Sequence, residues 1–208
     1  MKQMLARGAE SIIFKIERWG QSYVLKWRQD KPYLLNEIDT HLRRSRIARE
    51  CKMLTIARSL GVRTPAVYSV DLINHTILMD LIEGKQFKEI AGDVPKSELV
   101  SFSREFGRII ANLHEGNVVH GDPTTSNVII DKSNKLWLID FGLSEMNATI
   151  ETKGVDLHLI QRALETTHWD LQETMLEATL EGYHEVMGGH AEPVLSRMQE
   201  IRERGRYH

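Results

Sequence analysis

The stretch of sequence that decides the fold runs from Val118 to Gly142 and reads VVHGDPTTSNVIIDKSNKLWLIDFG. Its apolar residues surround three polar ones: Asp122, then Asn127 five residues later, then Asp140 eighteen residues after Asp122. A single aspartate or asparagine in such a place is commonly a turn or cap residue. Three of them at this spacing, each beside a short strand-like run, indicate a functional site.

The composition of the 208-residue chain is that of a soluble globular protein, with 41% hydrophobic and 27% charged residues. The 27 lysines and arginines nearly balance 29 aspartates and glutamates, so the formal charge of -2 favours neither nucleic-acid nor membrane binding. A single cysteine, Cys51, excludes an internal disulfide and fits a reducing compartment. The N-terminus lacks an apolar signal core, and no run approaches the ~18 apolar residues of a spanning helix. We therefore expect a cytoplasmic protein that does not bind membranes.

The hydrophobic pattern changes near Glu83 and Gly84, where strand-like segments give way to helical ones. The segments expected before this point are a hairpin over residues 11–17 and 22–27, a long helix over 34–60, and strands over 67–72 and 76–84. Those expected after it are a helix from an N-cap at Ser97 to Gly116, short strands over 117–119, 127–131 and 135–140, and helices from Val155 onward. The pattern predicts an α+β protein with one lobe over residues 1–83 and a second, helical lobe over 84–208.

The central stretch resembles the catalytic-loop and metal-binding motifs of the protein-kinase-like superfamily, whose usual forms are H-R-D-x-x-x-x-N and D-F-G. By this resemblance Asn127 and Asp140 are ligands of a Mg2+ ion on the phosphates of ATP, and Asp122 is the catalytic base or orienting residue. Phosphoryl transfer requires such a set because negative charge accumulates on the transferring group. The resemblance implies a minimal bilobal kinase-like fold with a small β-rich N-lobe and a reduced helical C-lobe.

Two residues upstream match the ATP-binding partners of these motifs. Lys26 in VLKW matches the catalytic strand lysine that contacts the α- and β-phosphates, and Glu50 matches the helix glutamate that pairs with it. Gly8 in RGAES stands where the glycine-rich phosphate loop would be, with Ser11 within reach of phosphate. Only one glycine of the usual three is present there, so a plain turn before a strand is an equally good interpretation.

A hinge between the lobes would supply the adenine-binding main-chain groups. By the same resemblance these are the groups of Met79, Asp80, Leu81 and Ile82.

Several departures separate the chain from typical protein kinases. Gly121 replaces the arginine of H-R-D, Thr124 stands where a lysine is usual, and only sixteen residues separate Asp140 from Asp156. Such a reduced kinase resembles the small atypical kinase subunits of the KEOPS complex, which serves threonylcarbamoyladenosine modification of tRNA. The segments that carry this resemblance are GAESIIFKI, RIARE, HGDPTTSN, DFGLS, VDLHLIQRALETTH and RERGR. The family usually has leucine in place of Pro123.

The KEOPS resemblance implies a Mg2+-dependent ATPase with atypical serine/threonine kinase activity. Its partners would be the tRNA-modifying ATPase-like subunit, contacted through the C-lobe, and the other KEOPS subunits. It also implies that Asp156 braces the catalytic loop, although an N-cap role suits that residue equally well. A basic tail with Arg202, Arg204 and Arg206 would reach toward tRNA, and a solvated helix end is the competing interpretation.

Three other functions remain open. A RIO-type protein kinase would phosphorylate a separate protein substrate, and a pseudokinase scaffold would bind a partner and hydrolyse nothing. The intact set of Lys26, Glu50, Asp122, Asn127 and Asp140 argues against the scaffold. A small-molecule kinase of the aminoglycoside or choline type needs a larger helical lobe than the roughly fifty residues after Asp156 provide.

Overall fold

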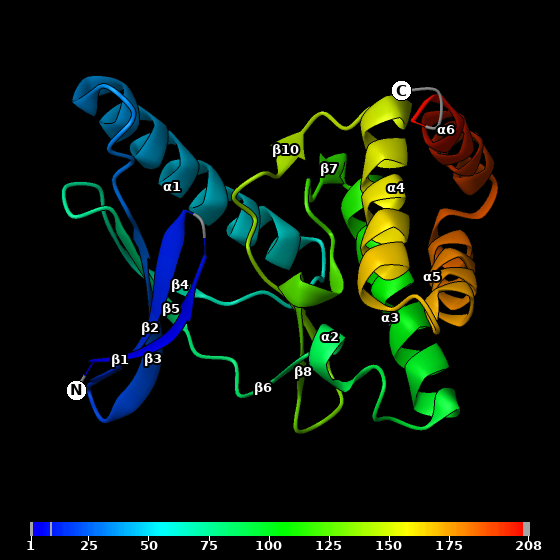
Figure 1. The fold of residues 1–208 in the computed structure, drawn as a ribbon, viewed down its shortest axis with the longest axis horizontal. Coiled ribbons are helices and arrows are strands. Elements are labelled where there is room, and N and C mark those ends of the chain that lie inside the picture. The colour runs from blue at the N-terminus through cyan, green and yellow to red at the C-terminus, as the bar shows by residue number, and fades with distance from the viewer. Residues whose placement is uncertain (1, 9, 206–208) are drawn as a thin grey trace.

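The N-terminal part of the protein is built on one antiparallel sheet. The computed structural model describes residues 2–8 and 10–205. Five strands form the sheet in the order β1, β2, β3, β5, β4. They are β1 (Lys2–Arg7), β2 (Ser11–Arg18), β3 (Gln21–Arg28), β4 (Val67–Asp71) and β5 (Thr76–Asp80). A long helix, α1 (Asn36–Ser59), runs from beside this sheet toward the C-terminal part, as Figure 1 shows.

The C-terminal part is mainly helical. Its helices are α2 (Phe87–Ile90), α3 (Lys96–Glu115), α4 (Ile150–Thr167), α5 (Gln172–Met187) and α6 (Ala191–Arg204), with the 3-10 turns η1 (Thr125–Asn127) and η2 (Gly188–His190). Its strands are β6 (Gly84–Gln86), β7 (Val118–Val119), β8 (Val128–Asp131), β9 (Leu136–Leu138) and β10 (Glu145–Met146). Strands β6, β8 and β9 form a small antiparallel sheet, and β7 pairs with β10. Helix α3 packs on α5, and α4 packs on α6 (Figure 1).

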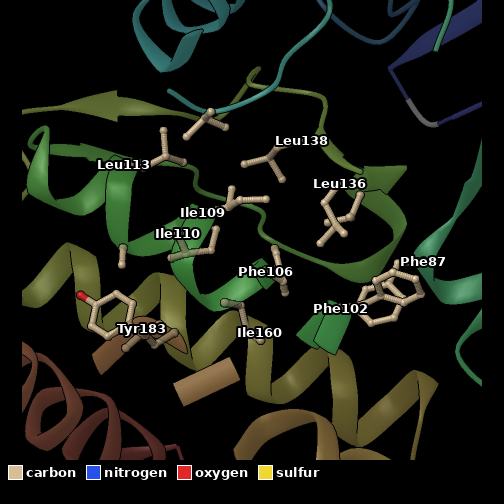
Figure 2. Packing of buried hydrophobic residues seen from close by; sticks show 14 of the residues in the cluster. Phe87, Phe102, Phe106, Ile109, Ile110, Leu113, Leu136, Leu138, Ile160 and Tyr183 are labelled. Atoms are coloured by element: carbon tan, nitrogen blue, oxygen red, sulfur yellow. The ribbon is translucent and has the colours of Figure 1, made fainter. Parts of the chain in front are cut away.

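One hydrophobic core joins these helices to the small sheet. The buried face of α3 carries six large apolar residues: Leu99, Phe102, Phe106, Ile109, Ile110 and Leu113. Figure 2 shows Leu136 and Leu138 of β9 meeting this face from one side and Tyr183 of α5 meeting it from the other. Full burial of each such side chain stabilises the folded state by about 1.5–3 kcal/mol relative to leaving it exposed. The core therefore fixes the strands that flank Asn127 and Asp140.

The α+β prediction is confirmed, and so is the long helix, which spans Asn36–Ser59. The N-cap at Ser97 is wrong, because α3 already begins at Lys96, directly after Pro95. Proline suits this place because its ring fixes φ, here at -55°, and a helix start does not need its missing N–H. Strand β1 was not predicted, because its residues are all exposed and carry no apolar alternation.

The start of α4 at Val155 is also wrong, since the helix begins at Ile150. Thr149 caps it: its hydroxyl accepts a hydrogen bond from the Thr152 amide at 3.2 Å, and its own amide donates to the Thr152 hydroxyl at 2.8 Å. The usual form of this capping box carries Glu or Gln at the third helical position, so the threonine version is harder to find in a sequence.

The division into lobes at residues 83 and 84 stays our proposal. It is supported by the pairing of the strands, since β5 belongs to the large sheet whereas β6 pairs with β8 of the C-terminal part. Among the described residues, no helix combines the length and the apolar character needed to cross a membrane.

The backbones of helices α3 and α5 lie close together at two glycines. A Cβ atom on Gly107 would lie 1.9 Å from the carbonyl oxygen of Thr179, and one on Gly182 would lie 1.9 Å from that of Arg104. Neither place has room for a methyl group, so these helices pack backbone against backbone.

We predict that Gly107→Ala lowers the free energy of unfolding by about 1–3 kcal/mol, the usual cost of overpacking. Helix propensity alone would act in the opposite direction by about 1 kcal/mol. Urea unfolding measures the change, and Gly92→Ala, where the added Cβ would meet no atom within 4 Å, is the control. A Gly107→Ala protein more stable than the wild type would contradict this close packing.

Candidate functional site

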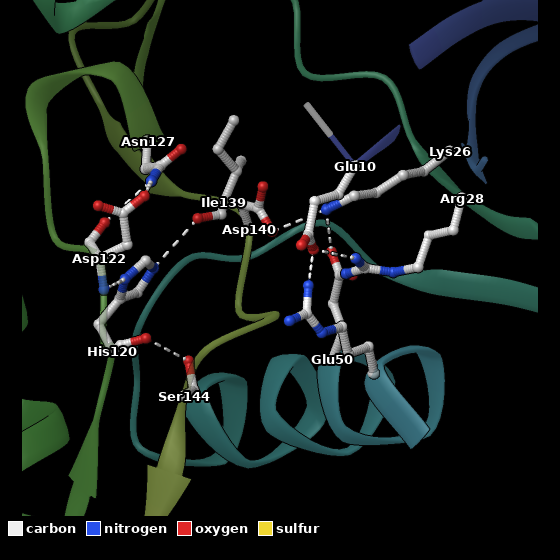
Figure 3. Close-up of polar contacts among 11 residues, drawn as sticks. Glu10, Lys26, Arg28, Glu50, His120, Asp122, Asn127, Ile139, Asp140 and Ser144 are labelled. Carbon is white, nitrogen blue, oxygen red and sulfur yellow. Dashed lines mark hydrogen bonds and ion pairs between the residues drawn. The ribbon is translucent and has the colours of Figure 1, made fainter. Parts of the chain in front are cut away.

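Lys26 lies at the centre of the site because its strand, β3, is paired on both sides. It stands opposite Ile13 of β2 and Ile77 of β5, and it is only 5% exposed. Its ammonium donates a hydrogen bond to Glu50 Oε1 at 2.6 Å and another to Asp140 Oδ1 at 2.7 Å (Figure 3). A buried ammonium is costly unless it is paired. These two carboxylates therefore hold the lysine in place.

Glu50 pairs with two cations at once. It lies on α1, is 1% exposed, and its second oxygen, Oε2, accepts a hydrogen bond from Arg28 Nη2 at 2.5 Å. Arg28 follows Lys26 by two residues, so both side chains leave β3 on the same face. Arg28 was not predicted as a site residue, although strand alternation from Lys26 was a signal that pointed to it.

Asp140 faces Lys26 from the C-terminal part of the chain. Its backbone lies in the left-handed region, with φ at 61°, which turns the side chain away from the regular course of the strand before it. Burial by itself would raise the pKa of this carboxyl, but the charges of Lys26 and then Arg28 outweigh it and lower the pKa. Asp140 is therefore ionised at neutral pH and able to bind a cation.

Asp122 and Asn127 meet across the turn η1. The Asn127 amide nitrogen, Nδ2, donates to the main-chain oxygen of Asp122 and to its Oδ2, both at 2.9 Å. These bonds fix the amide so that its carbonyl oxygen points away from Asp122. The orientation leaves that oxygen available to a ligand.

His120 packs beneath this loop. Its Nε2 lies 3.1 Å from the carbonyl oxygen of Ile139, and its Nδ1 accepts a hydrogen bond from the Asp122 amide at 3.2 Å. Burial lowers the pKa of His120. A neutral ring with its proton on Nε2 satisfies both contacts, so the side chain supports the loop from below.

Asp156 braces the same loop from α4. Its Oδ2 accepts a hydrogen bond from the His120 amide at 2.6 Å, and its Oδ1 accepts one from the Gly121 amide at 2.8 Å. The N-cap interpretation of Asp156 is wrong, because the residue lies inside α4. Gly121 has a φ of 82°, and a Cβ there would lie 2.4 Å from the Leu143 carbonyl oxygen. An arginine cannot replace Gly121 without moving the segment after Gly142.

A cleft of about 820 Å³ runs between the large sheet and the C-terminal part. The structure brings nine of the predicted site residues to its wall: Gly8, Ser11, Lys26, Glu50, Met79, Leu81, Ile82, Asn127 and Asp140. The Asp122 side chain lies at a neighbouring pocket of about 450 Å³, which shares Asp140 with the cleft. The predicted base therefore lies next to the cleft.

The Asp80 side chain is the exception among the predicted residues. It turns outward, where Oδ2 accepts a hydrogen bond from the Ala66 amide and Oδ1 accepts one from the Tyr68 hydroxyl, both at 2.8 Å. Any part that Asp80 takes in binding therefore falls to its main chain, which was the group expected to bind adenine.

The oxygen atoms of Asp140 and Asn127 suit a Mg2+ ion. The described residues contain no group of three or more histidine, cysteine, aspartate or glutamate side chains that would hold a metal ion by itself. Magnesium is commonly bound through one or two protein ligands together with substrate phosphates. The residues present therefore fit an ion that arrives with a nucleotide.

Comparison with known proteins places the chain in a family. A family model described as RIO domain matches residues 12–176. The KEOPS complex subunit Bud32 of Pyrococcus abyssi is 41% identical over 213 residues, which cover 99% of this chain and 96% of that protein. The EKC/KEOPS complex subunit bud32 of Dictyostelium discoideum is 32% identical over 98% of this chain and 82% of the relative.

A longer relative contains a similar segment. A probable bifunctional tRNA threonylcarbamoyladenosine biosynthesis protein of Methanobrevibacter smithii is 38% identical over 98% of this chain, which spans only 36% of that protein.

Among solved structures, the Rio2 kinase of Chaetomium thermophilum, in a complex with ADP, Mg2+ and phosphoaspartate, superposes with a TM-score of 0.64. The match covers 99% of this chain and 72% of the kinase, at 18% identity, and it shows that the fold is kinase-like. With a family model over residues 12–176 and a relative 41% identical along nearly its whole length, this chain belongs to the RIO domain family and, within it, to the Bud32 subunits of the KEOPS complex.

Proposed function

We propose that the protein binds ATP with Mg2+ in the 820 Å³ cleft and acts as an ATPase and atypical serine/threonine kinase within a KEOPS complex. In that role it supports threonylcarbamoyladenosine modification of tRNA, the process named in its relatives. One observation carries the proposal. Lys26 of the N-terminal part donates one hydrogen bond to Glu50 and another to Asp140, and Asn127 donates to Asp122 on the adjoining loop.

Each of these residues has a separate task in the proposed reaction. Lys26 binds the α- and β-phosphates, and Glu50 holds the lysine in place. Asn127 and Asp140 hold Mg2+, which neutralises phosphate charge when it is bound. Asp122 orients the attacking oxygen and accepts its proton as that oxygen bonds to the γ-phosphorus and the bond to the ADP oxygen breaks.

The nucleotide base belongs at the other end of the cleft. Met79, Leu81 and Ile82 line the cleft there, and the hinge main chain, including that of Asp80, would bind adenine. Gly8, in the turn after β1, and Ser11, at the start of β2, also line the cleft, and we assign them to its phosphate end. A nucleotide laid between these groups would place its phosphates beside Lys26.

The partners follow from the family. We propose contact with the tRNA-modifying ATPase-like subunit through the C-lobe, together with the other KEOPS subunits, in the cytoplasm. In the tail, Arg202 pairs with Glu165 at 3.2 Å and Arg204 with Glu151 at 3.7 Å, whereas Arg206 lies outside the described residues. These exposed pairs are weak enough to exchange for tRNA phosphates, since such pairs contribute about 0–1 kcal/mol.

Phosphorylation of a separate protein is the second candidate function. It is favoured by the RIO domain match over residues 12–176 and by the fold shared with Rio2 kinase. Transfer of labelled phosphate from ATP to the co-purified complex distinguishes the two: label on a partner chain supports the kinase, and release as inorganic phosphate supports the ATPase. A scaffold without activity would give neither product.

We predict that Asp140→Ala lowers Mg2+-dependent ATP turnover about 100-fold or more, because an amide oxygen alone cannot replace a carboxylate on the metal. The protein should still fold, since Lys26 keeps Glu50 as its partner. Phosphate release at saturating Mg2+ measures the effect. Asp93→Ala, at an exposed aspartate, is the matched control. Wild-type turnover in Asp140→Ala would rule out the metal-binding role.

A second pair of variants separates binding from chemistry. Asp122→Asn should slow turnover about 100-fold and leave nucleotide affinity within about twofold, because the amide keeps the size of the side chain but accepts no proton. Lys26→Ala should weaken nucleotide binding as well as turnover. Titration with a non-hydrolysable ATP analogue and single-turnover kinetics give the two quantities. Equal changes in both variants would contradict this division of roles.

A further inference from the structure

A pocket of about 450 Å³ lies beside the nucleotide cleft and opens onto Asp122. It shares Ser11 and Asp140 with the cleft, and its wall carries Arg28 and Arg46. Neither arginine has a role in the reaction as described above. They are the starting point for a second binding site.

The carboxylate of Glu10 lies among three cations in this region. Its Oε1 is 2.7 Å from Lys31 Nζ, and its Oε2 is 3.5 Å from Arg28 Nη1 and pairs also with an Nη atom of Arg46. Figure 3 shows Glu10 close to Arg28, and Glu10 belongs to the turn that precedes β2. Within residues 2–8 and 10–205, Glu10 is the only acidic partner of Arg46. One carboxylate thus occupies a place surrounded by donors.

The ion pairs of this cluster join four cations to three carboxylates, and the carboxylate of Asp122 lies on the wall of the same pocket. The four cations are Lys26, Arg28, Lys31 and Arg46, and the three carboxylates are Glu10, Glu50 and Asp140. In addition, Arg28 is only 4% exposed and its Nε has no hydrogen-bond partner among the described residues. A buried donor without an acceptor costs free energy, so a dianion in place of the carboxylate would be well accommodated.

The sequence places both arginines at this point. Arg46 precedes Glu50 by four residues on α1, and Arg28 follows Lys26 by two residues on β3. The i,i+4 and i,i+2 spacings put each arginine on the face that already carries a residue of the cleft. The planar fork of arginine suits phosphate oxygens, which it binds through two parallel hydrogen bonds.

We propose that Arg28 and Arg46 form a phosphate-binding site and that the Glu10 carboxylate occupies the place of the phosphate in the nucleotide-free protein. The ligand is a phosphate dianion, either the γ-phosphate of ATP or the inorganic phosphate released from it. The identity of this ligand rests on the proposed function. The loop between His120 and Asn127 contains no lysine or arginine. Positive charge next to Asp122 therefore comes from Arg28 and Arg46, which belong to the N-terminal part.

Calorimetric titration of the nucleotide-free protein with inorganic phosphate at constant ionic strength tests the site. Arg46→Gln should weaken phosphate binding about tenfold, and Glu10→Gln should strengthen it about tenfold because the competing carboxylate is gone. Arg44→Gln, which removes the same charge from an exposed position on the same helix, should change it less than about twofold. Opposite effects of the first two variants cannot both arise from poor folding.

Phosphate binding that is equal in the wild type and Arg46→Gln, or that falls equally in Arg44→Gln, would overturn the site. No tightening in Glu10→Gln would overturn the place assigned to its carboxylate. Titrations with ADP and with a non-hydrolysable ATP analogue separate the two sources. If the γ-phosphate occupies the site, Arg46→Gln weakens binding of the ATP analogue by about tenfold and leaves binding of ADP unchanged. If released phosphate occupies it, both nucleotide affinities stay unchanged and only phosphate binding falls.

The proposed function and the phosphate site can fail independently, because phosphate binding is measured without turnover. A wild type that hydrolyses ATP while Arg46→Gln binds phosphate normally would remove the site and leave the ATPase. A wild type that binds phosphate through Arg46 but never hydrolyses ATP would remove the ATPase and leave the site.

Discussion

The carboxylate of Glu50 is the contact on which the rest of the site depends. It is 1% exposed and bonds Lys26 through one oxygen and Arg28 through the other, which ties α1 to the central strand β3. Lys26 in turn holds Asp140 of the C-terminal part. Removing one partner of a buried ion pair typically costs about 3–5 kcal/mol, and the loss of Glu50 would affect two cations. Because burying these charges costs desolvation free energy, the arrangement serves to position the groups of the cleft more than to stabilise the fold.

The other half of the site is held by main-chain contacts. Asp156 binds the amides of His120 and Gly121 from the middle of α4, and this helix is fixed by the same core that holds β8 and β9. Gly121 can take its left-handed backbone beside Leu143 because it has no side chain. The loop therefore keeps its shape without the arginine that typical kinases carry there. Asp122 and Asn127 are positioned by the fold around them rather than by a long activation segment.

Much of the fold and of the site could be predicted from the sequence. Spacing singled out Asp122, Asn127 and Asp140 as candidates, which the structure brings to the cleft and the pocket beside it. Alternation of apolar residues located the strand of Lys26, because such a pattern can be recognised from neighbouring residues alone. The exposed strand β1 and the start of α4 could not be found in this way, since neither carries an apolar pattern that marks it. Glu10, Arg28 and Arg46 were not singled out, because they are distant in sequence and only the packing of α1 beside β3 and the turn before β2 brings them together.

The most direct test of the Glu50 contact is a double-mutant cycle on Lys26 and Glu50. The quantity measured for each variant is its free energy of unfolding in urea. The variants are Lys26→Met, Glu50→Gln and the two combined. If this buried pair joins α1 to β3, the loss of unfolding free energy in the combined variant will be smaller than the sum of the two single losses by at least about 2 kcal/mol. Effects that add to within about 0.5 kcal/mol would show that the two side chains are not coupled, and would contradict the central role of Glu50.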